Sequence, residues 1–240
     1  MFEKELAYRF LKETNFSLKG LRFRDYPVPE VGFYKEYSDA PKVKLPKVSL
    51  KEDVGLFEVL SRRRSRRNYN RYPISIEEVA CLCFSAQGIT AKSGFYLLRT
   101  APSAGALYPI ETYVVVNYSK DLPSGLYHLE VRNFELALLR EGHFGRLLAD
   151  LALGQSFFAT ASLVFVWTAV LPRTLSKYKD RGMRYIFMDV AHICQNLLLC
   201  AEALGLKACP VGAFFDEEFN EFLEVDGVIE STIYLATVGK

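Results

Sequence analysis

The chain has 240 residues, of which 50% are hydrophobic, 14% aromatic and 24% charged. This composition is typical of a globular chain that can bury a full core, and it argues against intrinsic disorder. Thirty basic residues stand against 28 acidic ones, giving a formal net charge of +2. Since so small a balance gives no general electrostatic reason to bind nucleic acid, any anion-binding site must be local.

The first 50 residues differ from the rest because four prolines interrupt them, Pro27, Pro29, Pro41 and Pro46. Proline fixes φ and lacks an amide donor, so no long helix or central strand is expected here. We expect a short helix over residues 2–11 and then an extended arm lying over the domain surface. A disordered tail is the alternative, and the aromatic content of the segment argues against it.

From residue 51 the hydrophobic pattern becomes regular and predicts a single mixed α+β domain over residues 51–240. Helical spacing is expected over residues 54–60, 76–83, 144–153 and 185–204. Strands are expected over residues 113–117 and 232–238, in a hairpin formed by 125–130 and 134–139, and in a buried strand over 162–170. Ser75 is the expected N-cap of the second helix with Glu78 as its capping-box partner, and Gly205 is expected to close the last one.

No segment resembles an export signal or a membrane span. The N-terminal MFEKELAYRF is charged, unlike the apolar region of a signal peptide. The most apolar run, residues 159–171, is shorter than the ~20 residues that a membrane-spanning helix needs. We therefore expect a soluble, cytoplasmic protein without a membrane partner.

The cysteines lack the paired spacing of zinc ligands. They are Cys81, Cys83, Cys194, Cys200 and Cys209, and the chain has only three histidines that could complete a site. No bound metal is expected, and small buried thiols kept reduced in a cytoplasm explain the cysteines best.

A basic cluster runs from Arg62 through Arg63, Arg64 and Ser65 to Arg66 and Arg67. Guanidinium groups bind phosphate through two parallel hydrogen bonds, and a serine hydroxyl adds another. Taken alone, such a cluster is more often a solvated helix end or a nucleic-acid patch, so it indicates a phosphomonoester site only in combination with other motifs.

Two loops combine small residues with proline. They are APSAGALYPIE, residues 101–111, and CPVGAF, residues 209–214. Small side chains let the backbone approach a flat ligand closely, and prolines hold the loop rigid. Ordinary tight loops are the alternative, so the first is a moderate indication of a binding loop and the second a weak one.

Two further features surround the long helix. In KYKDRGMRY, residues 177–185, Lys177 and Tyr178 could exchange a proton with a substrate. The commoner meaning of such a run is a charged helix start. Inside the helix, Asp189, His192 and Asn196 share one face of an otherwise apolar segment. A buried polar stripe must be hydrogen-bonded across an interface or to a ligand, and we expect His192 to be a satisfied, buried structural residue.

Taken together and in this order, these segments resemble the nitroreductase-like flavoprotein superfamily. Within it they resemble the SagB-type dehydrogenase branch, which includes azoline oxidases of thiazole- and oxazole-containing peptide synthesis. The resemblance covers residues 56–239 and is carried by SRRRSRR, PSAGALYPIE, KYKDRGMRY, HICQNLLLCAEALGL and CPVGAF. It implies an α+β fold, a central and mostly antiparallel sheet flanked by helices. It also implies an intertwined homodimer with two FMN sites at the subunit interface.

The resemblance also assigns roles to individual residues. The FMN-binding R-S-x-R segment of the family corresponds to Arg63, Arg64, Ser65 and Arg67. The loop that approaches the flavin ring, from the partner subunit, corresponds to Pro102, Ser103, Ala104 and Gly105. The loop whose backbone faces flavin N5 corresponds to Pro210, Val211, Gly212 and Ala213. Lys177 and Tyr178 fall on the proton-handling pair of the azoline oxidases.

The chain departs from the family pattern in two ways. A further basic residue usually follows the final strand, and here only Lys240 can take that part. No peptide-recognition module is visible, although azoline oxidases act within a multi-protein synthetase.

The expected function is therefore FMN-dependent oxidoreduction, with hydride transfer at flavin N5 to or from a small or peptide-derived substrate. A nitroreductase or quinone reductase that takes electrons from NAD(P)H is one alternative. A flavin-binding module without turnover is another. The Lys177–Tyr178 pair favours the dehydrogenase.

Overall fold

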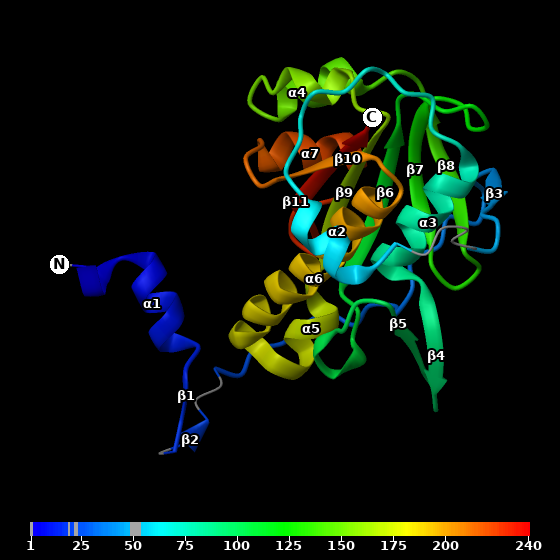
Figure 1. The fold of residues 1–240 in the computed structure, drawn as a ribbon. Coiled ribbons are helices and arrows are strands. Elements are labelled where there is room, and N and C mark those ends of the chain that lie inside the picture. Colours follow the sequence, from blue (N-terminus) through cyan, green and yellow to red (C-terminus); the bar gives the residue numbers. More distant parts are fainter. Residues whose placement is uncertain (1, 19, 22–23, 49–53) are drawn as a thin grey trace.

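The structure is a computed structural model, and it describes residues 2–18, 20–21, 24–48 and 54–240 (Figure 1). Its central strands are β3 (Lys42–Lys44), β6 (Ile110–Val116), β7 (Gly125–Glu130), β8 (Glu135–Glu141), β9 (Leu163–Val170), β10 (Lys207–Val211) and β11 (Glu230–Gly239). Within the described ranges they form one seven-stranded sheet in the order β10-β11-β9-β6-β7-β8-β3. All neighbouring strands pair antiparallel, which confirms the predicted antiparallel sheet.

Helices cover both faces of this sheet, as Figure 1 shows. On one face lie α2 (Leu56–Arg62), α3 (Ile76–Gln87), α5 (Leu171–Tyr178) and α6 (Gly182–Ala203). The other face packs against α4 (Gly145–Leu151) and α7 (Asp216–Leu223). A hairpin of β4 (Ile89–Ser93) and β5 (Tyr96–Arg99) leaves the end of α3. This arrangement of helices and sheet confirms the predicted α+β class.

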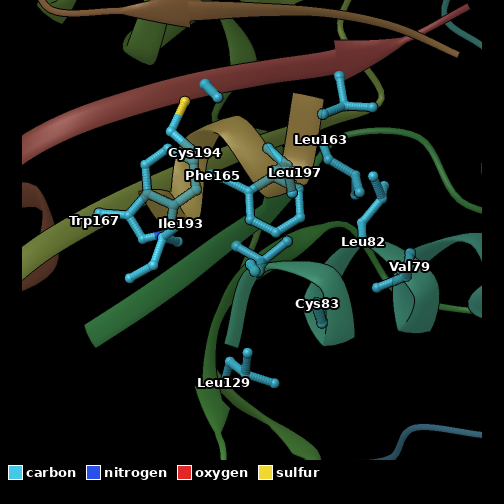
Figure 2. Close-up of a cluster of buried hydrophobic side chains, with 14 of the residues drawn as sticks. Val79, Leu82, Cys83, Leu129, Leu163, Phe165, Trp167, Ile193, Cys194 and Leu197 are labelled. Carbon is cyan, nitrogen blue, oxygen red and sulfur yellow. The ribbon is translucent and has the colours of Figure 1, made fainter. Parts of the chain in front are cut away.

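Two hydrophobic clusters hold the layers together, one on each face of the sheet. Strand β6 lies in the middle and is buried along its whole length. Its alternate residues serve the two clusters: Val114 joins the α3 and α6 side, and Val115 joins the α4 and α7 side. Figure 2 shows Phe165 and Trp167 of β9 beneath α6, near Ile193 and Leu197. Fully burying a large apolar side chain contributes about 1.5–3 kcal/mol, so this cluster fixes α6 on the sheet.

Two helix ends have the local structure that the sequence predicts. Ser75 accepts a hydrogen bond from the Glu78 amide, and the Glu78 carboxylate accepts one from the Ser75 amide, so the predicted capping box is confirmed. The long helix ends at Ala203, and Gly205 follows with a φ of +67°. This left-handed conformation is the one for which glycine is favoured after a helix. The helix begins at Gly182, three residues earlier than predicted.

The N-terminal part begins with a 3-10 turn η1 (Phe2–Lys4), α1 (Leu6–Glu13) and two short strands, β1 (Phe16–Ser17) and β2 (Gly20–Leu21). Helix α1 has no buried residue and stands to one side of the sheet in Figure 1. Arg184 ties its end to the body by donating to the Leu11 carbonyl at 2.6 Å. The boundary at residue 50 between arm and domain stays a prediction.

The following segment of the arm is joined to the sheet by partly buried polar contacts. Lys35 donates to Glu230 at 2.7 Å and to the Tyr113 hydroxyl at 2.6 Å. Lys42 lies 2.7 Å from the Glu130 carboxylate, beside the pairing of β3 with β8. These contacts come from three different strands, so residues 35–44 are an integral edge of the fold.

One stretch among the described residues, Leu171–Ala203, is long and apolar enough to cross a membrane by length and composition. It consists of α5, a 3-10 turn η4 (Lys179–Arg181) and α6. Half of its apolar window is buried inside the protein, and α6 packs against the sheet. We therefore interpret it as the core helix of the domain.

Candidate functional site

The arginine segment follows the end of α2 and runs beside the first residues of β10. Ser65 forms a parallel bridge with Ala208, and the Arg66 amide donates to the Ala208 carbonyl at 3.0 Å. Since β10 leads directly into residues 210–213, the structure brings together two of the motifs that the sequence singled out. They lie more than 140 residues apart in the chain.

The arginines of this segment fall into two classes. Arg62 pairs with Glu58 at 2.7 Å and lies 3.4 Å from Glu202, and Arg66 pairs with Glu202 at 2.6 Å. Among the residues that the structure describes, no carboxylate lies within ion-pair distance of the other three arginines, Arg63, Arg64 and Arg67. These three guanidinium groups are therefore the ones available to an anion, and they are the arginines assigned by the resemblance.

The motif CPVGAF, residues 209–214, lies partly in a strand. Pro210 and Val211 end β10, where they pair with Ala236 and Leu235 of β11. We predicted a loop for the whole motif, residues 209–214, which is wrong for Cys209, Pro210 and Val211. Because β10 is the edge strand of the sheet, a proline is tolerated there. Gly212 and Ala213 follow and are exposed, so the loop itself begins there.

The C-terminal lysine approaches this region through its backbone. The Asn70 amide donates to the Lys240 carbonyl at 2.9 Å, a few residues beyond the arginine segment. The Lys240 ammonium lies 5.0 Å from the centroid of the Tyr72 ring. Its part in holding a phosphate stays a prediction.

The loop at residues 102–105 is fixed to α6 by Asp189. Ser103 donates to this carboxylate at 2.6 Å, and the Ala104 amide donates at 3.3 Å. Asp189 is 5% exposed. Burial raises the pKa of its carboxyl, although both hydrogen bonds favour the ionised form. The polar residue of the helix is thus an anchor for the predicted binding loop.

The rest of the predicted polar stripe is not buried within one chain. His192 is exposed and Asn196 is partly buried, so the burial that we predicted for His192 stays a prediction for the expected dimer. The helix is also not buried all round, because Phe187 and Met188 are 48% and 54% exposed. Asp189 finds partners in a loop of its own chain. Helical periodicity indicated a polar face but not which neighbour it meets.

Lys177 and Tyr178 lie directly against the same loop. Gly105 has a φ of +65°, and a Cβ atom at this position would lie 2.7 Å from the Tyr178 hydroxyl and 3.0 Å from the Lys177 Nζ. The left-handed backbone conformation favours glycine here, and the ends of two side chains approach the position closely. The pair sits at the end of α5, where the Lys177 ammonium lies 5.2 Å from the Tyr178 ring centroid. A phenol and an ammonium thus flank a backbone position of the predicted flavin loop.

The turn after Gly105 holds strained backbone. Ala106 and Tyr108 have φ angles of 55° and 46°. Each such residue costs on the order of 1–3 kcal/mol and persists only where its surroundings enforce it. The Tyr108 amide donates to the Ser103 hydroxyl at 2.9 Å, and its own hydroxyl accepts from the Arg99 amide at 3.1 Å. Strain that is held this firmly is typical of functional loops.

A buried ionic chain supports this turn from beneath, and sequence reasoning missed it. Arg173 of α5 donates to Glu111 of β6 at 2.6 Å and to the Tyr108 carbonyl at 3.2 Å. Glu111 also lies 3.0 Å from the Nε2 of His128, whose side chain is fully buried. The available signal was an arginine three residues after a long apolar strand, because arginine is almost never buried without a partner.

Glu111 should make the stability of the protein depend on pH. Burial raises the pKa of this carboxyl, but the hydrogen bond to His128 and the charge of Arg173 outweigh burial and lower it to about 2. As the pH falls from 4.5 towards 2, the unfolded chain binds a proton that the folded chain refuses, so stability is lost in this window and is fully present above it.

We expect Glu111→Gln to be less stable than the parent at pH 6 but to lose less stability between pH 6 and pH 3. Urea unfolding at both pH values measures this difference. An identical loss in both proteins would show that Glu111 keeps its ordinary pKa in the folded state.

The site motifs therefore assemble into two groups along α6. The arginine segment lies near the end at Glu202 and leads through β10 to the 210–213 loop, whereas residues 102–105 and the Lys177–Tyr178 pair lie at Asp189. Thirteen residues separate these two anchors on the helix, which corresponds to roughly 20 Å. Within one chain, the groups are neighbours along the same helix and do not form one cluster.

Comparison with known proteins places these features in a family. The profile of the nitroreductase family matches residues 60–240. A Methanocaldococcus jannaschii protein named as a nitroreductase is 37% identical over 202 residues, which cover 84% of this chain and 98% of that protein. The trifolitoxin operon protein TfxC of Rhizobium leguminosarum bv. trifolii is 27% identical, over 90% of this chain and 64% of TfxC.

Solved structures show the same fold. A protein from Anabaena variabilis, described as a nitroreductase, matches with a TM-score of 0.72 and 28% identity over 90% of this chain and 45% of that one. The Escherichia coli microcin synthetase McbBCD complex, with truncated pro-MccB17 bound, matches at 0.64 and 20% identity over 98% and 82%. A Desulfovibrio desulfuricans structure in complex with FMN matches at 0.56 and 16% identity over 78% and 87%. The predicted nitroreductase-like fold is confirmed.

Proposed function

The chain belongs to the nitroreductase family, and we propose that it is an FMN-dependent oxidoreductase of the SagB-type branch. The observation that carries the proposal is the set of three arginines, Arg63, Arg64 and Arg67, beside the start of β10, for which the described part of the chain offers no carboxylate partner. The likeness to TfxC supports the branch. The FMN complex of the Desulfovibrio structure, a protein with the same fold, supports the cofactor.

The residues present fit the phosphate end of FMN. Arg62 and Arg66 are neutralised by glutamates, so the positive charge that remains is concentrated on the three other arginines. Ser65, between them, is exposed and adds a hydroxyl donor. A charge-assisted hydrogen bond to phosphate is about twice as strong as a neutral one, which makes this segment the natural phosphate holder. In this proposal Lys240 adds a further charge nearby.

The two small-residue loops fit the ring end. Gly212 and Ala213 expose backbone at the edge of the sheet, and the strained turn at Gly105 presents a second backbone surface without a Cβ atom. When bound, FMN supplies hydride transfer at N5, and the protein's contribution is binding, orientation and control of protons. Pro102 and Pro210 stiffen the two surfaces between which a flat ring would lie.

Lys177 and Tyr178 are the proposed proton-handling residues. Their polar atoms meet at Gly105, the point where the proposed ring-binding loop turns. Lys177 is exposed and Tyr178 is partly buried, so both can reach a substrate that stacks on the cofactor. An ammonium and a phenol are both groups that can act as general acids or bases.

A homodimer would bring the two groups of motifs together. The face of α2 and α6 that lies between them is apolar and exposed, with Phe57 of α2 at 85% and Met188 of α6 at 54%. Soluble chains rarely leave such a patch open to water. We propose that a second copy covers it, in an interface above ~2,000 Å², and that each FMN contacts the arginine segment of one subunit and residues 102–105 of the other.

The interface can be tested at the centre of this patch. We expect Phe187→Glu combined with Met188→Glu to weaken dimerisation by at least ~100-fold, since two unpaired charges would have to be buried. Light scattering measures the oligomeric state, and the visible spectrum measures retained FMN. Leu147→Glu is the matched control, because Leu147 is exposed on α4, on the opposite face of the sheet. A parent protein that holds FMN as a stable monomer would contradict the proposal.

Two versions of this function are possible, and they differ in the substrate and in the electron donor. The likeness to TfxC and to the McbBCD complex supports a peptide-derived substrate, although this chain spans 64% of TfxC. The Methanocaldococcus relative supports the second version, a nitroreductase or quinone reductase driven by NAD(P)H. Purified protein should show a flavin spectrum, and bleaching by NADH or NADPH without oxygen would favour the second version. Bound flavin that no donor reduces would favour a binding module.

We also propose that the protein is cytoplasmic.

A further inference from the structure

The buried guanidinium of Arg173 connects three segments that meet beneath the proposed flavin loop. Its Nε donates to the Gly32 carbonyl of the arm at 2.8 Å. Its Nη1 donates to the Tyr108 carbonyl at 3.2 Å and to the Glu111 carboxylate at 2.6 Å. The side chain is 3% exposed, so water cannot replace these partners. We propose that Arg173 is a positioning residue, which holds the 105–108 turn in its strained conformation and thereby sets the ring-binding side of the site.

The first step of the argument is that the turn needs an external restraint. Ala106 and Tyr108 both have positive φ angles, and neither is a glycine. The Ser103 hydroxyl restrains the amide side of Tyr108, and Arg173 restrains its carbonyl side. Loss of the restraint on the carbonyl side lets strained backbone relax, because the strain itself favours the relaxed form.

The second step is that the turn and the Lys177–Tyr178 pair share this residue. Arg173 lies one helical turn before Lys177 on α5, so its side chain fixes the helix that carries the pair. The turn that it holds is in contact with both polar groups at Gly105. The same guanidinium therefore fixes the positions of both the loop and the helix that meet in this contact.

The third step is that the geometry requires arginine. One planar group serves two carbonyls and a carboxylate at the same time, in three directions. A lysine ammonium on a flexible stem keeps the charge beside Glu111 but cannot reproduce the planar fork. Arg173→Lys thus separates the positioning role from simple charge neutralisation of Glu111.

The test uses the full chain without flavin and then with added FMN, because the proposal rests on the proposed function but its first readout does not. Hydrogen exchange at the Ala106 and Tyr108 amides reports the turn, since both donate to Ser103. In Arg173→Lys we expect these amides to exchange at least roughly tenfold faster, with amides of β9 unchanged, as expected for loss of one charge-assisted hydrogen bond. The dissociation constant of FMN should rise by a similar factor in a fluorescence titration.

Matched controls keep the result interpretable. Arg140→Lys changes a guanidinium that also binds a carbonyl and a glutamate, those of Phe222 and Glu224, and it should leave the turn unchanged. Glu111→Gln keeps an acceptor for Arg173 and should keep the turn protected. If the lysine variant does not fold, Arg173→Met combined with Glu111→Gln is the second variant, because it removes both buried charges together. Turn exchange equal to that of Glu111→Gln alone would then overturn the proposal.

Two results for Arg173→Lys overturn the proposal. One is turn exchange equal to that of the parent. The other is faster exchange at the turn and in β9 alike, which would mean a general loss of stability. A parent chain that binds no FMN would refute the proposed function, and the exchange comparison would still decide the role of Arg173.

Discussion

Replacing the Lys177–Tyr178 pair should lower substrate-linked flavin reduction by ~10²–10⁴-fold, the usual contribution of a general acid or base. The variants are Lys177→Ala and Tyr178→Phe, each of which removes one proton-exchanging group. The flavin content should stay at the parental level, because neither side chain belongs to the arginine segment that we propose holds the phosphate. Stopped-flow absorbance of the bound flavin measures the rate after mixing with the donor.

The control for this experiment is Lys44→Ala, which removes an exposed lysine on β3, an edge strand of the sheet. It should reduce flavin at the parental rate. If the Lys177 and Tyr178 variants also did so, the pair would only pack against Gly105, and the main support for an azoline-type dehydrogenase over a nitroreductase would be gone.

The central layers of the fold could be predicted because their signals are local. The β-branched run that became β6, the apolar run that became β9 and the hairpin of β7 and β8 each follow from residue pattern alone. The capping box at Ser75 likewise needs only four consecutive residues. Where the pattern and the environment agree over a few residues, sequence is sufficient.

The elements that were missed depend on position in the sheet or on non-local contacts. Strand β10 contains Pro210, which is compatible with a strand only because β10 lies at the edge. Helix α5 begins directly after β9, and the Pro172 near its start was compatible with a first helical turn but not diagnostic of one. Strands β4 and β5 and helix α7 had no prediction at all.

In the candidate site, too, local features could be predicted from the sequence and non-local contacts could not. Motif order indicated the arginine segment, both loops and the Lys177–Tyr178 pair, but not their grouping. The partner of Asp189 is Ser103, 86 residues earlier in the chain, and helical periodicity carries no information about it. The division of the arginines also depends on a distant residue, Glu202 on α6. The sequence therefore predicts which residues take part, and only the fold shows which of them are free to bind.

The difference between the glutamate-paired arginines and the other three gives a test of FMN binding. Arg67→Ala should raise the dissociation constant of FMN by roughly 10–150-fold, since a charge-assisted hydrogen bond is worth about 1.5–3 kcal/mol. Arg62→Ala is the matched control, because Arg62 lies in the same segment but is already paired with Glu58 and Glu202. It should change the constant by less than about twofold.

The measurement is fluorescence titration of flavin-free protein with FMN, with unfolding curves as a check on the fold. The ratio between the two arginine variants carries the argument, because both remove one positive charge from the same surface. A general electrostatic attraction would weaken equally in both, and equal losses would therefore show that no specific phosphate site exists at this segment. A large loss in Arg67→Ala alone would assign the phosphate to the arginines that pair with no carboxylate among the residues described. FAD should bind more weakly than FMN in the parent, since the site that we propose is built for a terminal phosphomonoester.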